Sequence, residues 1–230
     1  MQPKAQRAIV GRRRRWHVDD ALQEAPLKIQ SVLFDADGVI QRPAAQRREA
    51  WQSLLGPGRS VDDFFSAVLR AERPAWLGSA NFIESFSGLL LEWRCVGTLD
   101  DALAAWTMIE PDVEMLNAVA TLRQRGVACH LATNQEPIRA AYMSERLGYQ
   151  GLFDREFYSC RLGFAKPDAA YFQTLLARLA LPPTAVLFLD DKEANVAAAR
   201  AVGLNAEQFV VEARSSQLDP ILAAYGLGVV

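Results

Sequence analysis

Residues 31–39 read Ser-Val-Leu-Phe-Asp-Ala-Asp-Gly-Val, a short apolar run that ends in two acids and a glycine. Such a run is typical of a strand buried on both faces of a parallel sheet, with polar residues at its end. Side chains at positions i and i+2 of a strand point to the same side. The carboxylates of Asp35 and Asp37 are therefore expected to face one pocket, and Gly38 permits the sharp turn that follows.

Two carboxylates this close repel each other. The arrangement is tolerated best when a divalent cation neutralises one of them and the other carries a proton. An acidic turn after a strand is also common without any function, so residues 35–38 alone leave both interpretations open.

Similar apolar runs recur along the chain, at 127–132, 157–158, 186–189 and more weakly 209–211. Helical spacing of apolar residues before Gly126, after Pro137 and after Pro167 predicts helices between these runs. Alternating strands and helices predict right-handed crossovers and a parallel sheet covered on both faces. The fold class is therefore α/β, with a Rossmann-like three-layer α/β/α core.

The stretch 43–106 breaks this alternation because it reads as helices only. Helices are expected at 44–55, 61–72, 81–94 and 99–109, separated by Gly-Pro-Gly at 56–58, by Pro74 and by Gly97. An insert directly after the first strand is best interpreted as a small all-helical cap over the carboxyl ends of the strands, where open α/β sheets bind ligands. The core then comprises 29–42 and 107–230.

Composition favours a small solute as the partner. The 230 residues are 50% hydrophobic and carry a formal net charge of -2, which predicts no binding of nucleic acid or of an acidic membrane. Residues 1–28 contain the basic run 12–15 and few periodic apolar positions, so we expect a flexible, solvated basic tail. The sequence predicts nothing about the oligomeric state.

Cysteine usage and hydropathy indicate a cytoplasmic location. Cys95, Cys129 and Cys160 are far apart and form no CxxC pair, so neither a disulfide framework nor a zinc site is predicted. No apolar run approaches the roughly 20 residues that cross a bilayer, and none follows the basic start as in a signal peptide.

Two further polar segments suit the binding of phosphate. Thr133 and Asn134 end the run 127–132, and a hydroxyl with free backbone N–H groups before a helix can hold a phosphate. Both residue types also cap helices everywhere. Lys166, one of four lysines in the chain, stands directly before the helix-opening Pro167, where an ammonium group can bind phosphate. A surface lysine in a loop is an equally good interpretation of this segment alone.

A second acidic pair, Asp190 and Asp191, ends the run 186–189. Carboxylates are hard oxygen ligands, and Mg²⁺ needs only one or two of them in addition to water and substrate oxygens. The alternative is that the pair merely caps the following helix.

Taken together, the four segments resemble the haloacid dehalogenase-like hydrolases: DxDG(V/T), then Thr or Ser, then Lys, then DD. The resemblance covers 29–227 and includes a helical insert between the first and second motifs, as in phosphatase-type members with an α-helical cap. It implies a magnesium-dependent phosphatase that acts on a small phosphorylated metabolite, such as a sugar phosphate.

The resemblance also implies a role for each motif residue. Asp35 would attack phosphorus and become an aspartyl phosphate, and Asp37 would protonate the leaving oxygen and later deprotonate water. The phosphoryl oxygens would be held by Thr133, Asn134 and Lys166. Mg²⁺ would be bound by the carboxylate of Asp35, the backbone carbonyl of Asp37, and Asp190 and Asp191.

Three alternatives stay open. A phosphosugar mutase shares all four motifs, and a 2-haloacid dehalogenase resembles the chain in fold but lacks an acid at position 37. A non-catalytic binding protein is the third. Five residues of the predicted cap could reach the pocket and select the substrate: Arg47, Arg48, Trp51, Trp76 and Phe82. The aromatic residues among them more commonly form the cap's own core. His130, at the second predicted strand, is interpreted as a packing residue.

Overall fold

A five-stranded parallel sheet with the order β5-β4-β1-β6-β7 forms the centre of the protein. The computed structural model describes residues 28–228, so the predicted basic tail lies outside the described residues except for Lys28. β1 is central, and Leu33 pairs with His130 on one side and Phe188 on the other. The strands are β1 (Ser31–Phe34), β4 (Ala128–Thr133), β5 (Arg155–Tyr158), β6 (Val186–Asp190) and β7 (Asn205–Gln208).

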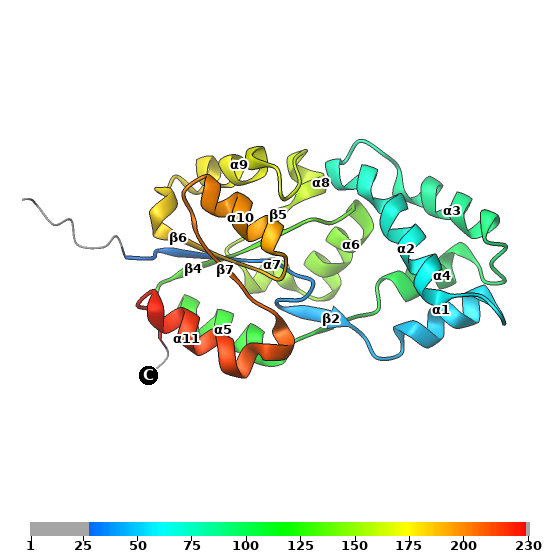
Figure 1. Ribbon diagram of the computed structural model, residues 1–230, viewed down its shortest axis with the longest axis horizontal. Helices are drawn as coiled ribbons and strands as arrows, with labels where there is room; N and C mark the ends of the chain where they lie inside the picture. Colours follow the sequence, from blue (N-terminus) through cyan, green and yellow to red (C-terminus); the bar gives the residue numbers. More distant parts are fainter. Residues whose placement is uncertain (1–27, 229–230) are drawn as a thin grey trace, which may run out of the picture.

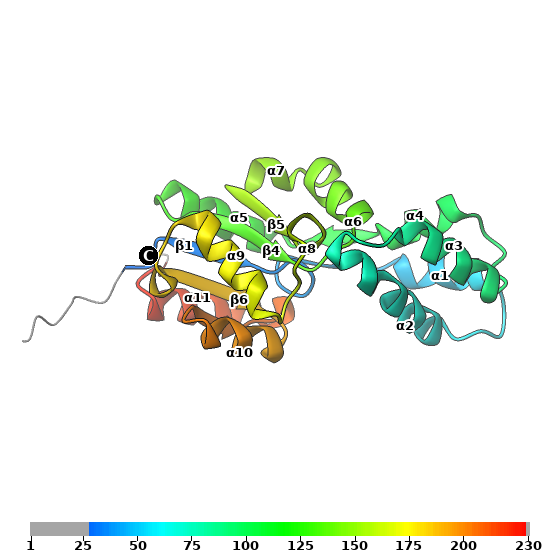
Figure 2. The same cartoon turned by 90° about the horizontal axis from the view of Figure 1, so that it is seen from above.

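Helices cover both faces of this sheet, which confirms the three-layer α/β/α prediction (Figure 1, Figure 2). Side chains alternate along β1, so Leu33 packs with one layer while Val32 and Phe34 pack with the other. Each fully buried Leu or Phe contributes roughly 1.5–3 kcal/mol relative to an exposed one. One layer holds α9 (Ala169–Leu179) and α10 (Glu193–Ala201), and the other holds α5 (Val113–Gln124) and α11 (Arg214–Ala224).

Four further helices form a separate hydrophobic cluster at one end of the molecule, to the right in Figure 1. They are α1 (Arg47–Leu55), α2 (Val61–Glu72), α3 (Phe82–Glu92) and α4 (Leu99–Trp106), with the short turn η1 (Arg73–Leu77). Ser60, Asn81 and Thr98 accept backbone N–H groups and so begin α2, α3 and α4. On this packing we propose that 43–106 is a cap domain and that 29–42 and 107–230 are the core.

The two connections between cap and core pair with each other, which the sequence did not predict. β2 (Gln41–Pro43) and β3 (Ile109–Pro111) form an antiparallel pair in which Pro43 lies opposite Ile109. The helix predicted over 99–109 is therefore wrong at its end, because α4 stops at Trp106. Pairing between segments so far apart in the chain leaves no local signal.

The remaining elements correct the prediction at two places. The weak strand predicted at 209–211 is wrong: β7 lies earlier, and Val211 begins the turn η4 (Val211–Ala213). β7 is an edge strand with polar residues, so its sequence lacks an apolar run. α11 was not predicted. The shorter elements are α6 (Pro137–Ala141), η2 (Tyr142–Arg146), α7 (Tyr149–Leu152), α8 (Ser159–Leu162) and η3 (Pro183–Ala185).

The helices and the cysteines bear on the predictions about membrane spans and disulfides. Every helix within residues 28–228 is too short or too polar to cross a lipid bilayer. Cys95, Cys129 and Cys160 are all free thiols.

Candidate active site

The carboxyl ends of β1 and β6 bring three acids together. Asp35 directly follows β1, Asp190 ends β6, and Asp191 comes next in the chain. One carboxylate oxygen from each of these acids lies within 4.8 Å of the other two. β1 and β6 are neighbours in a parallel sheet, so their ends meet at the same edge.

Lys166 is buried between two of these acids. Its Nζ lies 2.8 Å from Asp35 Oδ1 and 2.6 Å from Asp190 Oδ2, and it donates a 2.8 Å hydrogen bond to the carbonyl of Ala132. The three ammonium donors therefore all have protein acceptors. Burial by itself lowers the pKa of Lys166, but Asp35 and Asp190 outweigh it and raise the pKa above its usual value.

Asn134 holds the backbone of Lys166 in place. Its side-chain amide donates to the Lys166 carbonyl and accepts from the Lys166 N–H, each at 2.8 Å. The Asn134 side chain thus fixes the backbone of Lys166 from both its donor and its acceptor group. Thr133 ends β4, is almost fully buried, and lies with its hydroxyl 3.5 Å from Gln135 Nε2.

The chemistry of the acidic cluster fits a hard divalent cation. Asp191 Oδ1 is buried and has no hydrogen-bond partner among the described residues. Burial raises the pKa of Asp191, and it raises that of Asp35 to about 6 against the opposing effect of Lys166. Asn195 Nδ2 donates to both oxygens of Asp190, at 2.9 and 3.0 Å, and so orients it. A cation bound by these oxygens would offset the cost of burying them.

Gly38 lets the chain pass close to the acidic cluster. Its φ is +86°, and a Cβ at this position would lie 3.0 Å from Asp191 Oδ2. Any larger residue would therefore strain the backbone and displace Asp191. Gly38 is thus needed both for the turn after Asp37 and for the position of Asp191.

The Asp37 carboxylate is not among the three grouped acids and is held by a different set of side chains. Its carboxylate accepts from Gln41 Nε2 and Arg139 Nη2 through Oδ1 and from Gln135 Nε2 through Oδ2, each at 2.8 Å. Burial raises its pKa, but Arg139 and the two glutamines outweigh this and lower it below the usual value. The side chain of Asp37 is 39% exposed, whereas that of Asp35 is 6% exposed. Asp37 therefore lines an accessible part of the site.

Two charged cap residues act on Asp37. Burial and the nearby Arg139 lower the pKa of Arg47 to about 10, while Asp37 and Glu72 oppose that change. Burial raises the pKa of Glu72 to about 7, and Arg139 opposes the rise. A cation and a buried carboxyl group of the cap are thus electrostatically coupled to Asp37 and Arg139.

Of the other residues proposed to reach the pocket, Trp76 lies beside Glu72 and lowers its pKa, whereas the rest lie elsewhere. Arg48 forms an exposed ion pair with Asp62 at 2.6 Å, and Trp51 and Phe82 are buried in the hydrophobic cluster of the cap. His130 packs edge-on against Phe157, with ring centroids 5.8 Å apart, and burial lowers its pKa to about 4.

Comparison with known protein families shows which proteins this chain resembles. A model of haloacid dehalogenase-like hydrolases matches residues 29–203, about three quarters of the chain. The chain belongs to the haloacid dehalogenase-like hydrolases. It is accordingly a hydrolase, as the four motifs predicted.

Several curated relatives of this hydrolase are phosphatases. Validoxylamine A 7'-phosphate phosphatase from Streptomyces hygroscopicus subsp. limoneus is 28% identical over 181 residues, which cover 75% of this chain and 82% of the relative. Fructose-1-phosphate phosphatase YqaB from Escherichia coli (strain K12) is 25% identical, with 76% and 93% covered. The match to sesquiterpene phosphatase astK from Aspergillus oryzae, at 33% identity, spans 42% of this chain and only 49% of that protein.

Solved structures share the fold of this hydrolase. An enzyme of the haloacid dehalogenase (HAD) family from Bacteroides thetaiotaomicron aligns with a TM-score of 0.68 at 19% identity, covering 79% of this chain and 93% of the other. A crystal structure of that enzyme contains magnesium and inorganic phosphate. An L-2-haloacid dehalogenase aligns with a TM-score of 0.61 at 17% identity, covering 78% and 85%. Because both kinds of enzyme share the fold, the fold does not select the chemistry.

The motifs did not reveal several residues of this site. Gln41, Gln135 and Arg139 surround Asp37, and Glu72 approaches from the cap. Gln135 stands two residues after Thr133, so strand alternation could have placed both side chains on one side. Gln41 lies only four residues after Asp37, in the same turn. Arg139 and Glu72 belong to segments whose meeting depends on the packed fold, and no spacing in the sequence indicates it.

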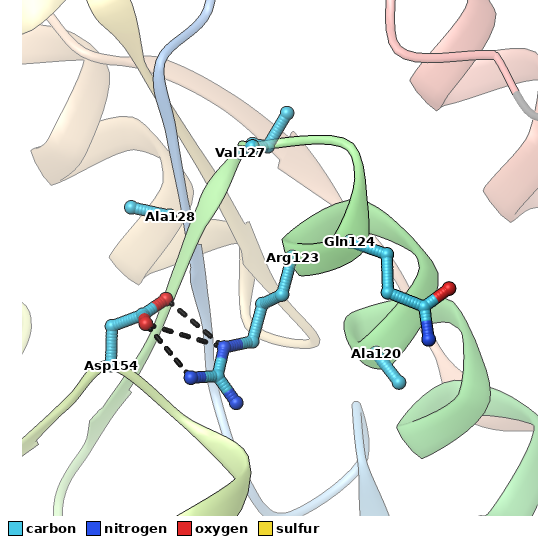
Figure 3. Close-up of a pocket in the computed structure, with 7 residues that line it drawn as sticks. Ala120, Arg123, Gln124, Val127, Ala128 and Asp154 are labelled. Atoms are coloured by element: carbon cyan, nitrogen blue, oxygen red, sulfur yellow. Dashed lines mark hydrogen bonds and ion pairs between the residues drawn. The ribbon is translucent and has the colours of Figure 1, made fainter.

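A pocket at the other end of the sheet does not belong to the site. It lies where α5 ends and β4 begins, and Figure 3 shows Arg123 and Asp154 facing each other within it. Their ion pair is 2.9 Å long, and Asp154 also accepts from the backbone N–H of Cys129 at 2.8 Å. These contacts tie β4 to the start of β5, which is a structural role.

Proposed function

We propose that this hydrolase is a magnesium-dependent phosphatase that forms an aspartyl phosphate on Asp35. The observation that carries the proposal is the grouping of Asp35, Lys166 and the two acids at 190 and 191 around one point, with Asp37 two residues away on a more open side. A nucleophile, a cation and hard oxygen ligands in one place are what phosphoryl transfer requires.

In the first step a carboxylate oxygen of Asp35 attacks phosphorus, and the bond from phosphorus to the leaving oxygen breaks. The leaving oxygen takes the proton of Asp37 and departs as an alcohol. Lys166 helps to offset the charge that gathers near Asp35. We further propose that Thr133 and the backbone N–H groups around Asn134 hold the phosphoryl oxygens.

In the second step a water molecule attacks phosphorus and gives its proton to Asp37. The bond from phosphorus to Asp35 breaks, which releases inorganic phosphate and restores the Asp35 carboxylate. Asp37 must be ionised to accept this proton. The three hydrogen bonds from Gln41, Gln135 and Arg139 favour that form.

The metal site would consist of the carboxylates of Asp35, Asp190 and Asp191 together with the backbone carbonyl of Asp37. When bound there, Mg²⁺ would reduce the repulsion between Asp35 and the anionic phosphate. The buried Asp191 oxygen without a hydrogen-bond partner supports this assignment. Asn195 and Lys166 already orient Asp190, so little rearrangement of that side chain is needed.

We propose a small, hydroxyl-rich phosphate ester, such as a sugar phosphate, as the substrate. Arg47 and Glu72 of the cap are close enough to Asp37 to interact with it electrostatically, and a carboxyl group and a guanidinium together can both accept from and donate to hydroxyl groups. A relative that is 25% identical is a fructose-1-phosphate phosphatase, which supports the same class.

The test is release of inorganic phosphate from p-nitrophenyl phosphate and from a panel of sugar phosphates, with and without Mg²⁺. The wild type is expected to be active only with the metal, and Asp35→Asn is expected to be inactive although folded. Wild-type activity no higher than that of Asp35→Asn on every ester would refute the proposal.

The same assay separates the alternatives. A phosphosugar mutase would convert a sugar phosphate to an isomer without releasing phosphate. A dehalogenase would release halide from a 2-haloacid and leave phosphate esters intact. The acid at position 37 favours the phosphatase, because an alkoxide leaving group needs a proton and a halide does not.

A further inference from the structure

Arg139 is the main positively charged partner of Asp37. Its guanidinium donates to Asp37 Oδ1 at 2.8 Å, and the arginine side chain is only 6% exposed. The two glutamines that also donate to Asp37 are neutral. A buried arginine has little rotational freedom, so this contact restrains the direction in which the Asp37 carboxylate points.

The Arg139 guanidinium is itself held against an aromatic ring. Its central carbon lies 4.9 Å from the centre of the Trp106 ring. Trp106 is fully buried and packs against Phe65, Phe82 and Phe86 in the hydrophobic cluster of the cap. A cation over an indole face is stabilised by the charge distribution of the ring.

Trp106 also fixes the helix that carries Arg139. Its indole Nε1 donates to Glu136 Oε1 at 3.0 Å. The Glu136 carboxylate accepts in addition from the backbone N–H groups of Ile138 and Arg139, at 2.7 and 2.8 Å, and so begins α6. One tryptophan therefore contacts both the guanidinium and the start of its helix, and both views show α6 on the side of the core that faces α4 (Figure 1, Figure 2).

We propose that Arg139 is a positioning residue for Asp37, and that Trp106 of α4 supports it in that role. The contacts form a continuous chain from the cap cluster through Trp106 and Arg139 to the carboxylate that exchanges protons with substrate and water. The inference rests on the proposed function, because orienting Asp37 matters only if Asp37 exchanges protons with substrate and water.

Substrates with different leaving groups provide the test. Phenyl phosphate releases a more basic oxygen than p-nitrophenyl phosphate, so it depends more on protonation by Asp37. The ratio kcat/KM includes the first transfer to Asp35 and therefore reports this protonation. Loss of active enzyme or of metal would lower kcat/KM for both substrates equally, whereas misdirection of Asp37 would lower it mainly for phenyl phosphate.

Arg139→Gln is the main variant. We expect kcat/KM for phenyl phosphate to fall about tenfold or more relative to that for p-nitrophenyl phosphate, and Arg139→Lys to recover part of this loss. Arg146→Gln, which removes an exposed arginine from the following turn η2, is the matched control and should leave the substrate ratio unchanged.

Trp106→Phe tests the support from the cap. It removes the indole N–H and shrinks the ring, so the substrate ratio should move in the same direction by a smaller factor. In the double variant with Arg139→Gln, the combined loss should be smaller than the product of the two single losses, because both act through one contact chain.

The outcomes are distinguishable. If the wild type hydrolyses both esters in an Asp35-dependent manner but folded Arg139→Gln loses equal activity on both, or none, the role of Arg139 is overturned. If Arg139→Gln does not fold, the substrate ratio of Arg139→Lys decides in the same way. If the wild type is no more active than Asp35→Asn on either ester, the proposed phosphatase function itself fails.

Discussion

Two acids only two residues apart in the chain sit in opposite surroundings. Asp35 is buried, contacts a buried lysine, and has its pKa raised to about 6, chiefly by burial. Asp37 is more open, and Arg139 with two glutamines lowers its pKa despite the effect of burial. The surroundings therefore stabilise the ionised form of Asp37 more than that of Asp35.

The difference extends to the two sides of the site. We call Asp35, Lys166, Asp190 and Asp191 the core-side cluster, and Asp37, Arg139, Glu72 and Arg47 the cap-side cluster. The first comes from the strand ends and the loop before α9, and it suits a metal and the attack on phosphorus. The second joins core and cap, and it suits the leaving group and water.

The largest expected effect is on the core side, for Lys166→Met. Removing the ammonium leaves Asp35 and Asp190 buried without their cation, which should lower the free energy of unfolding by about 3–5 kcal/mol. Urea denaturation without metal measures this, with Lys28→Met, an exposed lysine before the start of β1, as control. A loss below about 1 kcal/mol would mean that the cluster is less dependent on Lys166 than its distances imply.

Next comes a pH effect on the cap side, in Glu72→Gln. The folded-state pKa of Glu72 is raised from 4.5 to about 7, so its ionisation opposes folding. The contribution of the protonated Glu72 to the free energy of unfolding is fully present below about pH 4.5 and is lost as pH rises through about 7. Arg139, Asp37, Glu136 and Arg47 are the charged groups that act on it.

The variant Glu72→Gln should therefore gain about 3 kcal/mol relative to the wild type between pH 4 and pH 8. The difference is obtained by measuring the free energy of unfolding of both proteins across this range. Asp35 also titrates in this range, but it is present in both proteins, so its contribution cancels in the difference. A difference that does not change with pH would show that Glu72 ionises as freely in the folded state as in the unfolded state.

Metal addition should produce a comparable stabilisation on the core side. Binding at a Mg²⁺ concentration 100 times the Kd raises the free energy of unfolding by about 2.7 kcal/mol. The gain should be much smaller in Asp191→Asn, which removes a carboxylate that has a buried, unpaired oxygen. Calorimetry with and without Mg²⁺ provides the measurement, and an equal gain in both proteins would place the metal elsewhere.

The smallest expected effect compares two adjacent arginines of the cap. Arg47→Ala should raise KM for a sugar phosphate by roughly threefold to tenfold, about 1 kcal/mol, because the charge of Arg47 interacts with Asp37. Arg48→Ala should leave KM unchanged, since Arg48 only pairs with the exposed Asp62. Steady-state kinetics of the two variants decides this, and equal KM values would remove Arg47 from the cap-side cluster.

Much of the fold was predictable because its signals are local. The apolar runs at 31–34 and 186–189 became the buried strands β1 and β6, since a strand covered on both faces must be apolar throughout. The edge strand β7 was misplaced because its polar residues carry no such run. Its position depends on pairing with β6, from Leu187 opposite Asn205 to Asp190 opposite Gln208.

The sequence by itself determined where the acids of the core-side cluster stand, since a parallel sheet necessarily gathers the polar ends of its strands at one edge. Gln41 holds Asp37 from four residues away, within the same turn. Only the tertiary structure decided the other contacts, because Gln135, Arg139 and Trp106 come from segments with no shared periodicity. The physical reason is that alternation along a strand acts between near neighbours, whereas Gln135 and Arg139 reach Asp37 only when segments about 100 residues apart in the chain pack together.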